Sequence, residues 1–265
     1  MNAERIPVLM YHRIGEALNE WEQKYCISPD NFTAHMRALA DKGYKACSAN
    51  DFFDWLMGTT QLPDKSLLIT FDDGYLGVFE HGLPVLKALE WPAAMFLVSG
   101  LIGKNDSWCQ RENPSQETYP LMGVEEILTM RTQGFSFYSH SRSHPDLSQH
   151  EVSELTDELK GSREDLEQLL DDPIDYIAYP YGRYNDLVLE SVKKAGYQAA
   201  FSEQPGFNRP GVDPYRIRRI DVFGTDSPAM LIRKVSLGTN DGSWQHTLRY
   251  YFSRIFAKAG INKSI

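Results

Sequence analysis

The stretch Leu67-Leu68-Ile69-Thr70-Phe71-Asp72-Asp73-Gly74 decides the fold of this 265-residue chain and marks its candidate site. The run from Leu67 to Phe71 is short, continuous and mostly apolar, as is typical of a strand buried on both faces of a parallel sheet. Two carboxylates and a glycine then end the run. Comparable runs recur at 6–10, 94–98, 135–138, 176–179, 199–201 and 216–220. The pattern therefore predicts about seven buried strands.

Helical patterns lie between these runs. Expected helices span 31–42, 77–89, 124–132, 151–170, 186–195 and 227–237. Pro84 predicts a kink or a late start in the second of them. Because strands that alternate with helices form parallel βαβ units, the chain is expected to fold as α/β, a distorted parallel (β/α)7-type barrel with a single main domain.

Composition excludes several functions. The net charge of -9 leaves no basic footprint for nucleic acid. Cys26, Cys47 and Cys109 are widely spaced and form no CxxC pair, which argues against a thiolate zinc site. The first residues lack a signal-peptide pattern and no apolar run approaches the roughly 20 residues of a membrane span, so we expect a cytoplasmic location.

The predicted strand ends carry the chemistry. In β/α barrels, functional residues gather where strands end at their carboxyl side. Four strands here are followed by polar or special residues, namely Tyr11-His12, Asp72-Asp73-Gly74, His140 with His144, and Pro180-Tyr181-Gly182. We expect all of these to meet at one mouth, with Tyr11 and Pro180 contacting the substrate.

The Asp pair and the two histidines complement each other. Asp-Asp-Gly alone is also good turn chemistry, and a lone His-x-x-x-His pair can be surface or capping histidines. Histidines four apart on a helical turn can, however, share a metal ion. One carboxylate and two imidazoles form an open, three-ligand site that activates water, while the second carboxylate takes the proton. Such ligands favour zinc, with cobalt, nickel or iron as alternatives.

Three motifs carry a resemblance to a known family. Thr70-Phe71-Asp72-Asp73-Gly74, followed by His140-Ser-x-x-His144-Pro145, resembles the polysaccharide deacetylase family, carbohydrate esterase family 4. Residues 8–14 resemble the opening of its bacterial exopolysaccharide branch, which includes poly-N-acetylglucosamine deacetylases. Tyr179-Pro180-Tyr181-Gly182 resembles the family's third motif. The resemblance covers roughly Ile6 to Ile220, and we divide the chain into a catalytic domain, 1–237, and a C-terminal basic amphipathic tail, 238–265.

The resemblance implies a role for each matching residue. Asp72 would be the general base. Asp73, His140 and His144 would hold a divalent metal ion, zinc first. Tyr181 would offer its backbone N–H to the oxyanion that develops in the transition state.

The departures from the family pattern matter equally. The arginine that normally opens the third motif is replaced by Ala178, so Arg183, Arg216 or Arg219 is expected to substitute. The late Leu-x-His motif, which supplies the catalytic acid, is absent, because His246 has a different setting. We hypothesise that His12 is the acid; a packed histidine is the alternative interpretation.

Two further residues are predicted to contact the substrate. In the run 216–220, strand alternation places Ile217 and Arg219 on one face. An inward Arg219 would bind Asp72 or an anionic substrate group, and a solvated basic edge is the alternative. Trp108 belongs to a long loop, Gly103 to Leu121, expected to cover the mouth, where it would stack on a sugar or simply anchor the loop.

The expected function is metal-dependent N-deacetylation of N-acetylhexosamine units, in a bacterial glycan or its lipid-linked precursor, with release of acetate for exopolysaccharide biosynthesis. The alternatives are a hydrolase of other acetyl esters or small amides, and a non-catalytic sugar-binding module. The tail 238–265 has apolar residues at helical spacing with basic residues between them. It predicts either packing against the barrel or peripheral contact at the inner membrane face.

Overall fold

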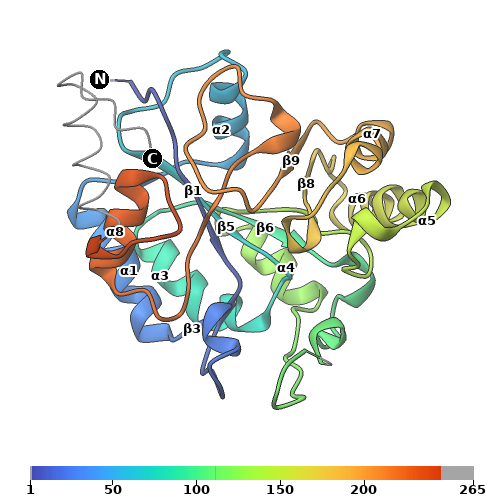
Figure 1. The fold of residues 1–265 in the computed structure, drawn as a ribbon, viewed down its shortest axis with the longest axis horizontal. Helices are drawn as coiled ribbons and strands as arrows, with labels where there is room; N and C mark the ends of the chain where they lie inside the picture. The colour runs from blue at the N-terminus through green and yellow to red at the C-terminus, as the bar shows by residue number, and fades with distance from the viewer. Residues whose placement is uncertain (1, 111, 246–265) are drawn as a thin grey trace, which may run out of the picture.

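A parallel sheet lies at the centre of the molecule and helices surround it (Figure 1). The computed structural model describes residues 2–110 and 112–245. The main strands are all parallel and run in the order β10-β1-β5-β6-β7-β8-β9. Their bounds are β1 (Val8–Tyr11), β5 (Ser66–Phe71), β6 (Ala93–Leu97), β7 (Phe135–Ser139), β8 (Tyr176–Ala178), β9 (Ala199–Phe201) and β10 (Ile220–Asp221). The prediction of a parallel (β/α)7-type barrel is confirmed.

The last predicted strand, 216–220, is wrong in its extent. Only Ile220 and Asp221 form β10, and a 3-10 turn occupies Pro214–Arg216. Ile217 bridges Phe201 of β9, whereas Ile220 pairs with Leu9 of β1. This segment therefore passes from one edge of the sheet to the other and brings the two edges together, which a single straight strand does not do.

The helices begin and end close to the predicted positions. They are α1 (Pro29–Asp41), α3 (Leu83–Ala88), α4 (Val124–Arg131), α5 (Val152–Thr156), α6 (Ser162–Leu170), α7 (Asp186–Lys194) and α8 (Pro228–Leu237). A π-helical turn at Val78–Gly82 precedes α3, whose first turn contains Pro84, so the late start is confirmed. A second π-helical turn, Asp157–Gly161, divides the long helix expected at 151–170 into α5 and α6.

Three short strands and one helix were not predicted. The strands are β2 (Arg13–Ile14), which pairs with β3 (Cys26–Ile27), and β4 (Lys45–Ala46), which pairs with β5. The helix α2 (Ala49–Leu56) packs Phe52 and Trp55 among the side chains that fill the barrel interior. It closes the end of the barrel at which the strands begin.

Alternate strand residues divide the core into two layers. One layer fills the barrel and includes Val8, Leu68, Phe96, Tyr138 and Phe201. The other packs between strands and helices and is drawn from the intervening positions, among them Leu9, Ile69, Met95, Phe137 and Ile177. Because side chains alternate along a strand, the inward series continues at the carboxyl ends of the strands. It places His12, Asp72, His140, Glu203 and Arg219 above the barrel interior.

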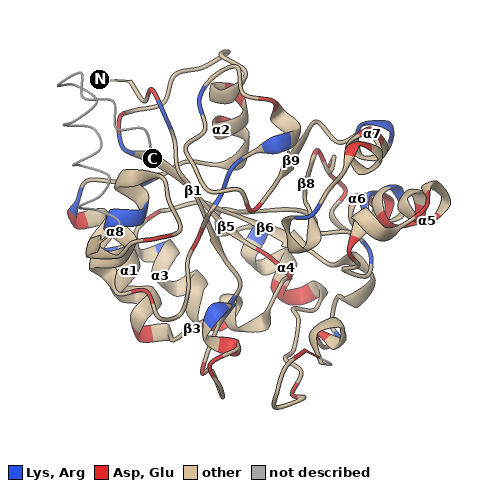
Figure 2. Cartoon of the chain, in the orientation of Figure 1, with Lys and Arg blue, Asp and Glu red and all other residues tan. Residues whose placement is uncertain are grey.

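Charged residues of both signs lie mainly on the outer helices and loops (Figure 2). Within the described residues, no helix combines the length and apolarity needed to cross a membrane. Cys26, Cys47 and Cys109 are free thiols.

Candidate metal centre and active-site pocket

Asp72 is held in place by a buried arginine. Its side chain is 1% exposed, and its Oδ1 accepts a hydrogen bond from Arg219 Nη1 at 2.6 Å. Oδ2 lies 3.8 Å from His140 Nε2. Burial alone would raise the pKa of Asp72, but the charge and hydrogen bond of Arg219 outweigh burial, and the pKa falls to about 2. Asp72 is therefore ionised at neutral pH.

Arg219 fills the place of the missing third-motif arginine. Its side chain is fully buried; Nε donates to the Ser202 carbonyl at 3.0 Å, and the guanidinium lies 5.6 Å from the centre of the Phe96 ring. The other two candidates are exposed and pair elsewhere, Arg183 with Asp146 and Arg216 with Asp213. The prediction that Arg219 binds substrate is therefore corrected, because its guanidinium lies inside the barrel and is bound to Asp72.

Asp73, His140 and His144 converge from two strand ends. Asp73 Oδ1 lies 3.5 Å from His140 Nε2 and 3.3 Å from His144 Nε2, and one ligand atom from each residue lies within 4.8 Å of the others. Donors about 2.05 Å from a tetrahedral ion are about 3.3 Å apart, so the two distances from Asp73 suit a shared metal ion. All three residues are buried.

Hydrogen bonding and charge at these residues also fit a metal. His140 Nδ1 lies 2.8 Å from the Ala178 carbonyl, an arrangement that leaves Nε2 free to coordinate. Burial lowers the pKa of both histidines, so the short distances to Asp73 join a carboxylate to neutral imidazoles. Asp73 Oδ1 has no hydrogen-bond partner among the described residues, and burial together with Asp72 raises its pKa. A divalent cation would satisfy that oxygen.

The loop between the two histidines is not the helical turn that their spacing suggested. Ser141 and His144 both adopt left-handed backbone angles, with φ of 64° and 63°. Ser141 Oγ accepts the His144 N–H at 3.0 Å, and Ser143 bonds to Glu158 through its backbone and its hydroxyl. Left-handed backbone angles are strained for residues other than glycine. The hydrogen bonds of Ser141 and Ser143 hold the loop in this strained conformation.

The third-motif turn places Tyr181 beside His144, one of the candidate metal ligands. Tyr181 has a φ of 56°, also in the left-handed region, and its ring meets that of His144 edge-on at 4.7 Å. Asp73, with a φ of 73°, makes four such strained positions at this site among eight in the described chain. Pro180 is buried beneath the turn and does not line the cavity, so its predicted substrate contact is corrected.

His12 and Tyr11 face opposite ways. His12 is half-buried, lines the cavity and meets Tyr25 edge-on at 5.3 Å. Burial lowers the pKa of His12 to about 4 despite the attraction of Asp72, so the imidazole is neutral at neutral pH. Tyr11 instead packs against Phe32 and reaches His35 with its hydroxyl at 3.3 Å. The prediction that Tyr11 binds substrate is corrected, because the odd positions of β1 face the helices.

The long loop from Gly103 to Leu121 covers the mouth as expected. Trp108 stacks on His144, with ring centres 4.6 Å apart and an angle of 24°. One face of the indole is thus used to hold a metal ligand, while Trp108 also lines the cavity. Asp106 anchors the loop, since it accepts hydrogen bonds from the Tyr75 hydroxyl and the Tyr119 backbone.

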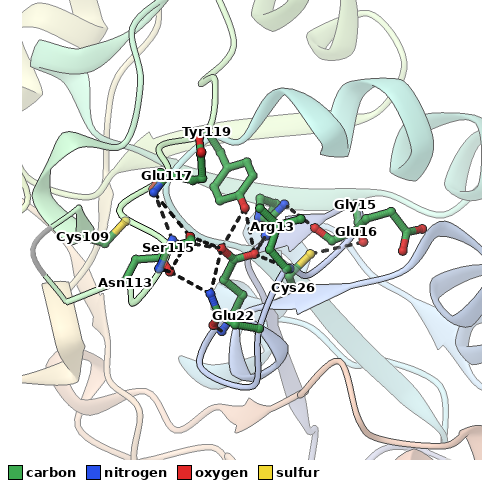
Figure 3. A network of polar contacts seen from close by, with 12 residues as sticks. Arg13, Gly15, Glu16, Glu22, Cys26, Cys109, Asn113, Ser115, Glu117 and Tyr119 are labelled. Atoms are coloured by element: carbon green, nitrogen blue, oxygen red, sulfur yellow. Dashed lines mark hydrogen bonds and ion pairs between the residues drawn. The ribbon is translucent and has the colours of Figure 1, made fainter.

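A buried carboxylate, Glu22, fastens this loop to the loop after β2 (Figure 3). Its side chain is 2% exposed and pairs with Arg13 at 2.8 Å, and Arg13 lies 3.4 Å from the centre of the Tyr119 ring. Tyr119 and Asn113 donate to Glu22 at 2.8 and 2.9 Å. Although burial raises its pKa, these hydrogen bonds and Arg13 lower it below the usual value. Glu22 thus joins two loops that wall the cavity.

These walls enclose a cavity of about 430 Å³ above the metal ligands. Sequence reasoning missed many of its lining residues, among them Glu22, Tyr25 and Glu203. Glu203 could have been found, because it lies two positions beyond Phe201 in the inward series of β9. Glu22 and Tyr25 lie in a loop with no pattern that signals their position.

The family is shown by comparison with known proteins. A model of the polysaccharide deacetylase family matches residues 59–200, and the chain belongs to this family. It is a deacetylase, a hydrolase that acts on carbon–nitrogen bonds other than peptide bonds. A purely sugar-binding module is not supported.

Individual relatives agree over most of the chain. YxkH of Bacillus subtilis, named as a candidate polysaccharide deacetylase, is 28% identical and covers 85% of this chain and 73% of its own. A poly-β-1,6-N-acetyl-D-glucosamine N-deacetylase of Staphylococcus aureus is 26% identical, with coverage of 85% and 81%. The structure of the Streptococcus pyogenes deacetylase PplD in complex with acetate superposes with a TM-score of 0.74 at 25% identity, covering 87% of this chain and 98% of that one.

The ion pair between Arg219 and Asp72 predicts that substitutions of the two residues change the free energy of unfolding non-additively. Arg219→Leu leaves a buried carboxylate without its partner and is expected to lower the free energy of unfolding by about 3–5 kcal/mol. Combining it with Asp72→Asn should restore part of that loss, as measured by urea unfolding. Arg216→Leu, at an exposed pair, is the matched control and should cost less than about 1 kcal/mol. Strictly additive effects of the two buried changes would contradict the role assigned to the pair.

The contacts of Glu22 predict that its loss loosens the cavity wall. Glu22→Gln removes the charge and one strong acceptor, and we expect a loss of about 1–3 kcal/mol in unfolding free energy. Backbone hydrogen exchange in residues 103–121 should become faster, while exchange in β5 and β6 stays unchanged. Glu117→Gln, on the same loop but exposed, serves as the control. Equal exchange in both variants would mean that Glu22 does not hold the loop.

Proposed function

We propose that the chain is a metal-dependent N-deacetylase that removes acetyl groups from N-acetylhexosamine units of a bacterial glycan. The observation that carries the proposal is the placement of Asp72, ionised by Arg219, directly beside the convergent donors of Asp73, His140 and His144. The named activity of the Staphylococcus aureus relative supports an N-acetylglucosamine substrate.

The donor set would hold a divalent ion through Asp73, His140 and His144. Such an ion, when bound, polarises an acetyl carbonyl and makes a bound water acidic near neutral pH. Imidazole and carboxylate donors suit zinc, and cobalt, nickel or iron bind similar sets.

The remaining steps belong to side chains and backbone of this chain. Asp72 accepts the proton of the attacking water, and Arg219 fixes the orientation of its carboxylate. The backbone N–H of Tyr181 is offered to the oxyanion of the tetrahedral intermediate. The departing nitrogen requires a proton. His12, at the same mouth and neutral before the reaction, is the candidate group that takes over the proton accepted by Asp72 and passes it to that nitrogen. Trp108 keeps the His144 ring in position by stacking.

The finer substrate assignment, a lipid-linked precursor at the inner membrane face, stays a prediction. It depends on the basic amphipathic tail, of which residues 246–265 lie outside the described part of the chain. Acetate release from a soluble glycan, but none from lipid-linked oligosaccharide, would count against it.

Acetate release from a panel of glycans tests the proposed function. Wild-type protein should release acetate from N-acetylated sugars, lose activity after chelation and regain it with a divalent metal. Asp72→Asn should lower kcat by about 10²–10⁴-fold while the protein still binds metal in a 1:1 ratio. Asp64→Asn, an exposed carboxylate, is the control. Release of acetate only from O-acetylated sugars would contradict the proposal and identify an ester, not an amide, as the substrate.

The role of His12 predicts a loss of kcat only for substrates whose leaving group needs a proton. His12→Ala should lower kcat on N-acetylated sugars by about 10²-fold or more, because the amine then departs without a proton donor. Hydrolysis of an activated aryl acetate, whose leaving group needs no proton, should fall much less. His81→Ala, on the outer surface, is the control. Near-normal turnover of the amide by His12→Ala would disprove the role.

A further inference from the structure

Glu203 lies at a boundary between two cavities. It follows β9 and continues the inward series of that strand. With His12 and Tyr25, it lines both the cavity above the metal ligands and an adjoining cavity of about 450 Å³ that reaches Asp221. A sugar unit that extends from the acetamide into the second cavity must therefore pass Glu203.

The third-motif turn fixes the position of Glu203. A Cβ atom added to Gly182 would lie 2.6 Å from both Cβ and Cγ of Glu203 and 2.9 Å from its Cδ. The side chain is therefore packed directly on the residue that follows Tyr181. This contact gives the carboxylate a defined place beside the turn that offers the oxyanion donor.

The carboxylate of Glu203 has no protein partner in the described chain. No hydrogen bond or ion pair to it forms there, whereas two other acids that line the same cavity are paired, Glu22 with Arg13 and Asp146 with Arg183. Burial, with the nearby Asp221 and Asp72, raises the pKa of Glu203 to about 7. A cation or hydrogen-bond donor beside it would favour the ionised form.

Away from the candidate metal donors, the described lining of the cavity offers an anion no unpaired lysine or arginine. The acidic residues there are Glu22, Asp73, Asp106, Glu112, Asp146 and Glu203. The two arginines that line it, Arg13 and Arg183, are already engaged in ion pairs. A carboxylate or phosphate on the sugar next to the acetamide would thus approach Glu203 without compensation, while an amine would be attracted.

We propose that Glu203 is a specificity-determining residue that selects N-acetylated glycans whose neighbouring sugar is neutral or carries a free amine, and disfavours glycans with a carboxylate or phosphate there. This rests on the proposed glycan deacetylase function and deepens it. A free amine is also the product of the reaction, so a unit that has already been deacetylated becomes a preferred neighbour for the next one.

Binding of three tetrasaccharides to the Asp72→Asn protein tests the proposal without turnover. The probes are a tetramer of N-acetylglucosamine, the same tetramer with one free amine, and a hyaluronan tetrasaccharide that carries uronates. Calorimetry should give the tightest Kd for the amine and the weakest for the uronate. Adding Glu203→Gln should compress the ratio of these Kd values by about fivefold or more, and Glu203→Lys should reverse their order.

The controls distinguish failure of this proposal from failure of the proposed deacetylase function. Glu190→Gln, an exposed glutamate on α7, should leave the ratio unchanged. The proposal would be overturned if the ratio stayed the same after Glu203→Gln and after Glu203→Lys, or if all three probes failed to bind. Acetate release by the wild-type protein is measured separately on the same probes and reports on the deacetylase function alone.

Discussion

The ion pair between Arg219 and Asp72 is the interaction on which the arrangement of the site depends. Both side chains are almost completely buried, and the bond of 2.6 Å joins the segment before β10 to the end of β5. An unpaired charge at this depth would be costly, whereas a paired one is tolerable and fixed in direction. The pair thus stabilises the closure of the barrel and aims the free oxygen of Asp72 at His140, one of the candidate metal ligands.

This interaction also explains how the chain differs from the usual family pattern. The third motif carries Ala178 where an arginine is expected, and the Ala178 carbonyl instead meets His140 Nδ1 at 2.8 Å. Because the sheet edges come together at 217–221, a guanidinium from the segment just before the last strand reaches the same carboxylate from another side. Because the barrel closes, Arg219 can bind Asp72 from beside β10, in place of the third-motif arginine that would reach it from β8.

Much of the fold could be predicted, because buried parallel strands are short apolar runs and strand ends collect functional residues. His140, His144 and one of the two aspartates were expected at a metal site from residue type and position, and the family resemblance assigned Asp73 to it. Tyr11 was assigned wrongly although strand alternation already separates it from His12. Three features depend on contacts between distant segments, which a local pattern does not contain. They are the helix α2, the passage of residues 216–219 between the two edges of the sheet, and the hydrogen bonds of Glu22 to the loop at 103–121. The left-handed angles at Ser141 and His144 are imposed by hydrogen bonds of the fold.

The packing of α2 against the barrel interior has a consequence for the order of events in one turnover. Phe52 and Trp55 fill the end at which the strands begin, and Phe96, Phe201 and Arg219 lie above them. This stack fills the barrel from that end, so among the described residues the site opens only on the side where the strands end, through the two adjoining cavities. The candidate metal donors lie at the floor of the first cavity. If the acetamide is cleaved there, acetate forms beneath the glycan and the larger product would leave first.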